Sequence, residues 1–272
     1  THVNGLSFIS LCISKINLFI RSANNVTIDG FNIIGILMNE SGTDEEVYYA
    51  DAHANKWQTI NVGGSNEAGG VSNIEVQNCD FVVNSGNKGN VALYVHDDCS
   101  VVSFTGNTVN GYIHGIYAHN NIDNLTVDDN DFTIVSFQRD NMSLWGGFDY
   151  TVGNGVTLNY GKNFVVTNNT FTGPGTFPTR GADPDGICNV YAMTDFISYF
   201  VTEPTADHVV NFSDNSITNF YLGMCTMASG GSMAENDIDS NLIGIQIGQQ
   251  HAVWATGEAE AVSIIGNDIT NN

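Results

Sequence analysis

The hydrophobic residues of this 272-residue chain follow one short pattern that recurs along its length. An apolar residue is followed by a second at the third position and by another at the eighth, with Asn frequent at the sixth. Eight copies begin at Val26, Ile74, Val102, Leu125, Phe164, Val210, Gly231 and Val262. The sixth position is Asn in six of them: Asn107, Asn130, Asn169, Asn215, Asn236 and Asn267. Alternation with period two predicts short strands whose first, third and eighth positions face a core.

The spacing of the copies predicts how these strands are connected. The shortest intervals are 21, 23 and 28 residues, which are too short for helical repeats and typical of a coil of short strands. Asn at a fixed corner fits such a coil, because it tolerates left-handed backbone and can hydrogen-bond to its equivalent in the next coil. The pattern therefore predicts a β-solenoid.

On these residues the chain resembles the right-handed parallel β-helix superfamily, which includes pectate lyases, polygalacturonases, alginate lyases and epimerases, and many surface or tail-spike proteins. The resemblance covers about residues 16–272. It implies an all-β fold, a single-stranded right-handed parallel β-helix of roughly 9–11 coils with neighbouring strands about 4.8 Å apart. We expect residues 1–272 to form a single β-helix domain, which could be a segment of a larger protein.

Longer intervals between copies indicate where the chain leaves the coil. We expect excursions near residues 40–70, 134–153, 172–185 and 195–207. Loops on a rigid scaffold commonly carry function, so these stretches bound the search for a site.

A second pattern, Gly-apolar-x-apolar-x, predicts one more strand in each coil, with its third and fifth residues pointing outward. It reads GILMN (35–39), GIYAH (115–119), GVTLN (155–159), GICNV (186–190), GMCTM (223–227) and GIQIG (244–248), and ALYVH (92–96) lacks only the Gly. The outward pairs then include Tyr94 with His96 and Tyr117 with His119. Cys188 and Cys225 share the third position in what should be adjacent coils, which predicts two thiols within reach of a disulfide.

The paired Tyr and His residues suggest carbohydrate chemistry. Aromatic rings stack on sugar faces, and a neutral His beside a Tyr can exchange protons. HDDC (96–99) resembles the Asp-Asp-Cys element of polygalacturonases, and that resemblance implies Asp97, Asp98 and His119 as catalytic residues for glycoside hydrolysis. With His96 and Tyr117 of the Tyr-His column they make up the predicted catalytic set. The alternative is that like residues stack for packing alone and that the Asp pair forms a turn.

A uronate lyase or epimerase is a second possibility. GADPDG (181–186) resembles an Asp-Pro element of alginate epimerases. The predicted substrate-binding residues are Tyr94, Arg139, Trp145, Asn159 and Arg180, of which the two arginines could neutralise a carboxylate. No cofactor is required. Ca²⁺ could also neutralise a substrate carboxylate, with Asp128, Asp129 and Asp131 as candidate ligands. These residues equally suit a solvated corner.

The charge and hydrophobicity of the chain limit the classes of molecule that it could bind. Seven Lys and Arg against 29 Asp and Glu give a formal net charge of −22, which argues against nucleic acid and anionic membranes. No run reaches the roughly 18 apolar residues of a membrane span. We expect an extracellular or cell-surface protein that meets a polysaccharide or surface glycan. The rival hypothesis is a non-catalytic surface, adhesin or filament protein whose solenoid ends are capped by neighbours through end-to-end self-association.

Overall fold

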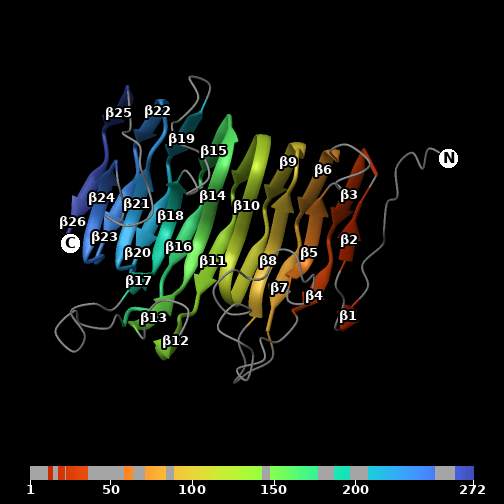
Figure 1. Cartoon of the computed structure of the whole chain (residues 1–272), viewed down its shortest axis with the longest axis horizontal. Helices are drawn as coiled ribbons and strands as arrows, with labels where there is room; N and C mark the ends of the chain where they lie inside the picture. The colour runs from red at the N-terminus through yellow and green to blue at the C-terminus, as the bar shows by residue number, and fades with distance from the viewer. Residues whose placement is uncertain are drawn as a thin grey trace.

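The computed structural model describes residues 12–14, 18–21, 23–35, 58–63, 71–83, 89–142, 148–176, 187–196, 208–248 and 261–272. Every regular element in these ranges is a β-strand. In the same ranges, no helix is long and apolar enough to cross a membrane. Figure 1 shows the strands of successive coils side by side, from β1, β2 and β3 at one end to β24, β25 and β26 at the other.

The first sheet contains the eight predicted copies in the predicted register. Val26 pairs with Ile74, Ile74 with Val102, and Val102 with Leu125, all in parallel. Its strands are β3 (Val26–Asp29), β6 (Ser72–Gln77), β9 (Ser100–Thr105), the end of β10 (Thr108–Asp128), β15 (Phe164–Thr167), β19 (Val209–Ser213), β22 (Gly230–Ala234) and β25 (Val262–Ile265).

The second sheet carries the eighth position of the pattern, again in register. Val109 pairs with Phe81 on one side and with Phe132 on the other. Its strands are β1 (Cys12–Ser14), β4 (Asn32–Ile34), β7 (Asp80–Val82), the start of β10, β11 (Asp131–Ile134), β16 (Thr170–Thr172), β20 (Ser216–Thr218), β23 (Asp237–Asp239) and β26 (Asp268–Thr270).

The third sheet contains most of the predicted Gly-led strands. Tyr117 pairs with Tyr94 and with Thr157, and His119 pairs with His96 and with Asn159. Its strands are β2 (Leu18–Ile20), β5 (Gln58–Gly63), β8 (Gly89–His96), the middle of β10, β14 (Asn154–Lys162), β18 (Tyr191–Phe196), β21 (Leu222–Thr226) and β24 (Ile243–Ile247).

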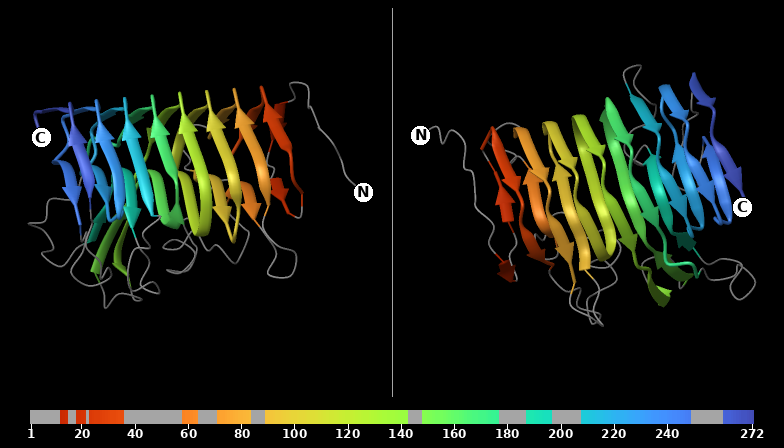
Figure 2. Two further views of the ribbon diagram at one scale, coloured as in Figure 1. Left: turned by 90° about the horizontal axis from the view of Figure 1, so that it is seen from above. Right: turned by 180° about the vertical axis from the view of Figure 1, so that it is seen from behind.

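The chain passes through the three sheets in turn, and β10 alone crosses all three. Seven passes within the described ranges are complete, and β1–β2 and β25–β26 add two partial ones, at the lower end of the predicted number of coils. The fold is a right-handed parallel β-helix. Figure 2 shows the stacked layers from two further sides.

The core is a column of apolar side chains inside the coil. Phe81, Phe104, Phe132 and Phe171 are at most 1% exposed. The ring centroids of Phe132 and Phe171 lie 4.8 Å apart in a parallel stack, and those of Phe81 and Phe104 lie 5.4 Å apart. The third and eighth positions of neighbouring coils therefore pack on one another, as the periodicity predicts. In the last described coil the equivalent Ile264 and Ile269 are exposed.

A hydrogen-bonded ladder of Asn side chains follows the corner between the first and second sheets. Asn169 Nδ2 donates to Asn215 Oδ1 at 3.0 Å, while Asn130 Nδ2 donates to Asn169 Oδ1 at 2.8 Å. Each amide nitrogen also donates to a backbone carbonyl of the preceding coil, as Asn169 does to Val127. The ladder is buried, so these bonds satisfy polar groups that would otherwise be costly.

The left-handed residue of this corner is the fifth position of the pattern, not the sixth. The fifth residues have φ between 52° and 72° in all eight copies: Gly30, Asn78, Gly106, Asp129, Asn168, Asp214, Glu235 and Gly266. The prediction of an Asn ladder is confirmed, but the idea that these Asn residues adopt left-handed backbone is wrong. The repeated Asn side chains instead form the hydrogen bonds between coils.

The Gly of the second pattern makes room for the core. A Cβ on Gly155 would lie 2.5 Å from the carbonyl oxygen of Ala192 and 2.6 Å from the Phe171 ring. Gly115 meets Phe132 in the same way. The missing side chain thus lets a large residue of the next coil fill the corner.

The excursion predicted at 134–153 forms part of a small separate sheet. β12 (Phe137–Met142) pairs antiparallel with β13 (Phe148–Val152), and β13 pairs in parallel with β17 (Ile187–Asn189). The green hairpin projects from the coil in Figure 2. The excursions expected at 40–70, 172–185 and 195–207 lie largely outside the described residues.

The assignment of GICNV to the third sheet is wrong. Cys188 lies in β17 and pairs with Thr151 of the side sheet. The position beside Cys225 in the third sheet is occupied by Thr194, and the buried Cys225 forms no disulfide with any described residue. The expected disulfide between Cys188 and Cys225 is therefore absent, because the two residues belong to different sheets.

Candidate functional site

The outer face of the third sheet carries a stack of aromatic rings in the middle of the solenoid. The ring centroids of Tyr94 and Tyr117 lie 5.8 Å apart, and Tyr94 and His96 lie 4.8 Å apart along one strand. Tyr117 stacks in the same way on His119 at 6.1 Å. Tyr94 and Tyr117 form a hydrophobic cluster separate from the main core. The predicted juxtaposition of the two Tyr-x-His copies is thus confirmed.

Burial differs across this stack. Tyr94 is 1% exposed and His96 is 8% exposed, whereas Tyr117 and His119 are half-buried. The expectation that Tyr94 presents its ring to solvent is therefore not met, because both faces of strand β8 are covered. The solvent-accessible surface of the stack therefore belongs mainly to Tyr117 and His119.

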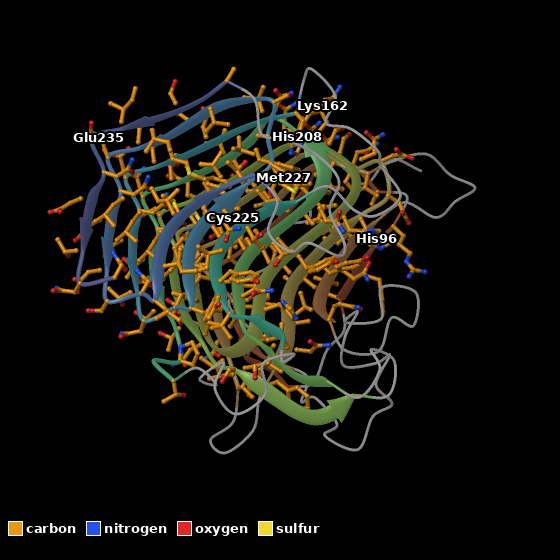
Figure 3. The ribbon with its side chains drawn as sticks, turned by 60° about the vertical axis from the view of Figure 1, so that its left-hand side comes forward. His96, Lys162, His208, Cys225, Met227 and Glu235 are labelled. Carbon is orange, nitrogen blue, oxygen red and sulfur yellow. The ribbon has the colours of Figure 1, made fainter. Side chains whose placement is uncertain are left out.

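His96 is held by contacts at both ring nitrogens. Its Nδ1 lies 2.8 Å from Asp97 Oδ2, and its Nε2 lies 2.9 Å from Asn61 Oδ1. Both partners are acceptors, so the ring satisfies them together only by donating from both nitrogens. The ring lies directly against Gly63, where a Cβ would overlap it. In Figure 3 the labelled His96 lies on the side of the coil formed by the third sheet.

The two predicted acids form a turn and point to different partners. Asp97 and Asp98 both have left-handed backbone, with φ of 53° and 56°. Asp97 contacts His96, while Asp98 is exposed and accepts a hydrogen bond from Asn121 Nδ2 at 2.6 Å. The backbone N–H of Asp97 donates to the carbonyl of His119, which ties this turn to the next coil. Asp98 is therefore the more exposed carboxylate of the pair.

His114 was not predicted from the sequence and lies beside the stack. It is 3% exposed, and its ring meets Tyr117 edge to face with centroids 6.1 Å apart. Burial lowers the pKa of His114 to about 4, so its imidazole is neutral near pH 7. Its Nδ1 atom is buried without a hydrogen-bond partner in the described part of the chain.

Two further buried polar atoms lie next to the stack on the neighbouring strand β14. Thr157 pairs with Tyr117 and Asn159 pairs with His119 across the sheet. Within the described ranges, neither Thr157 Oγ1 nor Asn159 Oδ1 has a hydrogen-bond partner, and both residues are at most 4% exposed. A buried polar atom without a partner costs about 1–3 kcal/mol, so each of these atoms needs a partner such as an ordered water or a ligand group.

Of the remaining predicted residues, those whose side chains the structure describes lie outside this group. Trp145 and Arg180 lie outside the described residues, and of Arg139 only the backbone, in β12, is described. Asp128 accepts hydrogen bonds from Thr167 and Asn168, and Asp129 and Asp131 are exposed at the corner. Among the described residues no three acidic, His or Cys side chains converge on a metal position. The suggested Ca²⁺ site at these residues stays a prediction.

Sequence reasoning missed Asn61, His114 and Thr157. Asn61 lies in the same outward column as Tyr94, but its strand lacks the Gly-led pattern. His114 precedes the Gly of GIYAH and was not counted as part of the strand. Thr157 follows the predicted outward alternation, and its place beside Tyr117 in the next coil is the signal that could have added it to the site.

A shallow depression of about 530 Å³ marks the outer face of the first sheet. It is lined by Asn25, Thr27, Asn73, Ile74, Glu75, Val101 and Ser103. Glu75 accepts a hydrogen bond from Thr27 there, and Val101 has left-handed backbone with φ of 53°. This surface carries no aromatic ring, unlike the stack on the third sheet.

Comparison with known proteins adds little to this picture. No family model and no curated protein matches the chain. A search of solved structures matches the crystal structure of a hyperthermoactive exopolygalacturonase from Thermotoga maritima, with 11% sequence identity and a TM-score of 0.39. The match covers 92% of this chain and 53% of that one, so the chain spans about half the length of that enzyme. The fold described above rests on the strand pairing of the chain itself.

Proposed function

We propose that this protein binds a polysaccharide along the outer face of the third sheet, centred on Tyr117 and His119. The observation that carries the proposal is the half-buried Tyr117 ring beside the unpartnered Thr157 Oγ1 and Asn159 Oδ1. Carbohydrate sites combine these elements, because a sugar ring offers an apolar face and hydroxyl groups at once. The extended sheet would let neighbouring sugar units follow the coil axis.

We assign any cleavage or modification of the bound glycan to Asp98 and His119. Asp98 is exposed, and the turn that holds it is bonded to His119 through the backbone. A carboxylate and an imidazole can act as acid and base in a hydrolase, lyase or epimerase reaction. His96 and Asp97 hold one another, which suits a positioning role for both.

Affinity electrophoresis through gels that contain single soluble polysaccharides tests the binding. We expect at least one glycan to retard the protein, and Tyr117→Ala to remove most of that retardation. Thr133→Ala is the matched control, because Thr133 is exposed on the second sheet, away from the stack. Unretarded migration in every gel, with a folded protein, would remove the proposal.

Product analysis on the retarding glycan separates binding from catalysis. Release of reducing ends would indicate a hydrolase, and absorbance from unsaturated products would indicate a lyase. We expect either activity to be lost in Asp98→Asn while retardation is kept, and we expect His119→Ala to weaken both activity and retardation. Retardation without product would leave a binding protein.

A non-catalytic surface or filament protein is the second candidate. The contacts of Tyr94 and His96 favour this candidate. Their stacking and the hydrogen bond of His96 stabilise neighbouring coils without any ligand. Such a protein would form concentration-dependent polymers, which analytical ultracentrifugation detects. In either role we expect the protein to work outside the cell or on its surface, where glycans are met.

A further inference from the structure

An Asn-Gly dipeptide lies on the outer face of the second sheet, where Asn110 is exposed and Gly111 follows it in β10. In this dipeptide the backbone nitrogen attacks the preceding side-chain amide most easily, because Gly has no Cβ to hinder the approach. We propose that Asn110 is a site of spontaneous deamidation, which converts it to Asp and isoaspartate in the folded protein. This modification does not depend on the proposed function.

The reaction needs water as its only other reactant. The backbone nitrogen of Gly111 loses its proton and bonds to Cγ of Asn110, while the side-chain nitrogen leaves as ammonia. Water then opens the resulting succinimide ring at one of its two carbonyl carbons. Cleavage at Cγ gives Asp, whereas cleavage at the main-chain carbonyl gives isoaspartate, in which the backbone runs through the side chain.

The strand is irregular at this dipeptide. Asn110 pairs with Val82 on one side and with Thr133 on the other. The pairing with β11 then skips Gly111 and resumes at Tyr112, and Gly111 has φ of 84°, which together form a β-bulge. A bulge disrupts the ladder locally, so the backbone there can rotate towards ring closure at a lower cost. Among the side-chain hydrogen bonds of the described residues, none holds Asn110 in place.

A second Asn-Gly dipeptide, Asn154 and Gly155 of β14, is held much more tightly. Asn154 is 6% exposed, and its Oδ1 accepts a hydrogen bond from the backbone N–H of Tyr191 at 3.2 Å. Gly155 packs against the carbonyl of Ala192. Ring closure at Asn154 therefore requires the strand to separate from its neighbour first. The remaining Asn-Gly dipeptide, at 4–5, lies outside the described residues.

Peptide mapping by mass spectrometry, on protein aged at neutral and at mildly alkaline pH, tests the proposal. We expect Asn110 to become Asp and isoaspartate, and faster at the higher pH, because the attacking nitrogen must lose its proton. A protein isoaspartate methyltransferase measures the isoaspartate independently. Asn154 should react at least about tenfold more slowly, because its buried hydrogen bond must open first. Asn110→Gln is the matched variant, since it keeps an amide but would need a larger ring, and it should abolish the product at this position.

The urea-unfolded chain is the control, because both dipeptides are then equally free to react. We expect similar rates at Asn110 and Asn154 in urea, so that their difference in the native protein belongs to the fold. The proposal is overturned if Asn110 stays unmodified in the folded protein under conditions in which the unfolded chain reacts. It is also overturned if Asn154 reacts as fast as Asn110 in the folded protein, because the bulge would then not select the site.

Discussion

At the scale of single residues, His114 shows how a buried position on the outer face affects stability. Burial lowers the pKa of His114 to about 4 in the folded protein, whereas the unfolded chain titrates near 6.5. Between these values the unfolded chain binds a proton that the folded chain does not. The free energy of unfolding therefore decreases as pH falls through this window, by up to about 3 kcal/mol from this residue.

Urea unfolding of the wild type and His114→Asn between pH 4 and pH 7 checks this expectation. Carboxylates titrate in both proteins, so the difference between the two curves isolates the imidazole. We expect the wild type to lose stability relative to His114→Asn as the pH falls from 7 towards 4. Parallel curves would show that His114 is not buried as a neutral ring.

Val101 is a second residue whose effect on the free energy of unfolding can be measured. It has φ of 53°, a conformation that is strained for a β-branched residue, and the equivalent positions in neighbouring coils are Asn73 and Asn124. We expect Val101→Asn to raise the free energy of unfolding by about 1 kcal/mol, because Asn tolerates this backbone. The reverse change, Asn124→Val, should lower it by a similar amount. Equal stability of all three proteins would contradict the strain.

Which residues face outward could be predicted from the sequence, but how deeply they are buried could not. Period-two alternation places Tyr94 and Tyr117 on one face and in one column, as the structure confirms. The alternation contains no information on what packs against that face, so the burial of Tyr94 and the half-exposure of Tyr117 were not predicted. His114 was missed because the strand begins before the Gly that defines the pattern.

At the scale of elements, the Asn ladder joins the coils. Asn169 makes hydrogen bonds to Asn130 and Asn215 on either side and to the carbonyls of Val127 and Thr167. Cys79 occupies the same position and accepts a hydrogen bond from the backbone N–H of Phe31. The ladder thus continues through a thiol where the sequence has no Asn.

Removal of one amide from the ladder should be costly. We expect Asn169→Ala to lower the free energy of unfolding by about 3 kcal/mol, because several buried groups lose their partner together. Asn211→Ala is the matched control, since Asn211 lies on the outer face of β19 and accepts one hydrogen bond from Ser232. Equal effects of the two changes in chemical denaturation would contradict the role of the ladder.

Strand register was predictable in two sheets because two signals coincide there. The apolar alternation and the corner Asn together fix the register of the first and second sheets, and the strand pairs observed there agree with it. The third sheet has alternation and Gly alone, and GICNV satisfies both although it belongs to the side sheet. The local pattern does not distinguish these sheets, because pairing with β13 depends on how the excursion returns.

At the scale of the whole molecule, the charge of −22 should oppose folding. Like charges spread along a coil repel one another, and salt screens that repulsion. We expect the urea midpoint to rise with NaCl concentration. A midpoint that falls would mean that surface ion pairs such as Lys162 with Asp123 stabilise the coil more than repulsion destabilises it.

The central claim is that the outer face of the third sheet is a carbohydrate surface. A crystal structure of the protein with a bound oligosaccharide tests it most directly. The account predicts a sugar ring against Tyr117, with hydroxyl groups within hydrogen-bond distance of Thr157 Oγ1 and Asn159 Oδ1. A sugar bound only elsewhere, with the Tyr117 surface bare and accessible in the crystal, would contradict it.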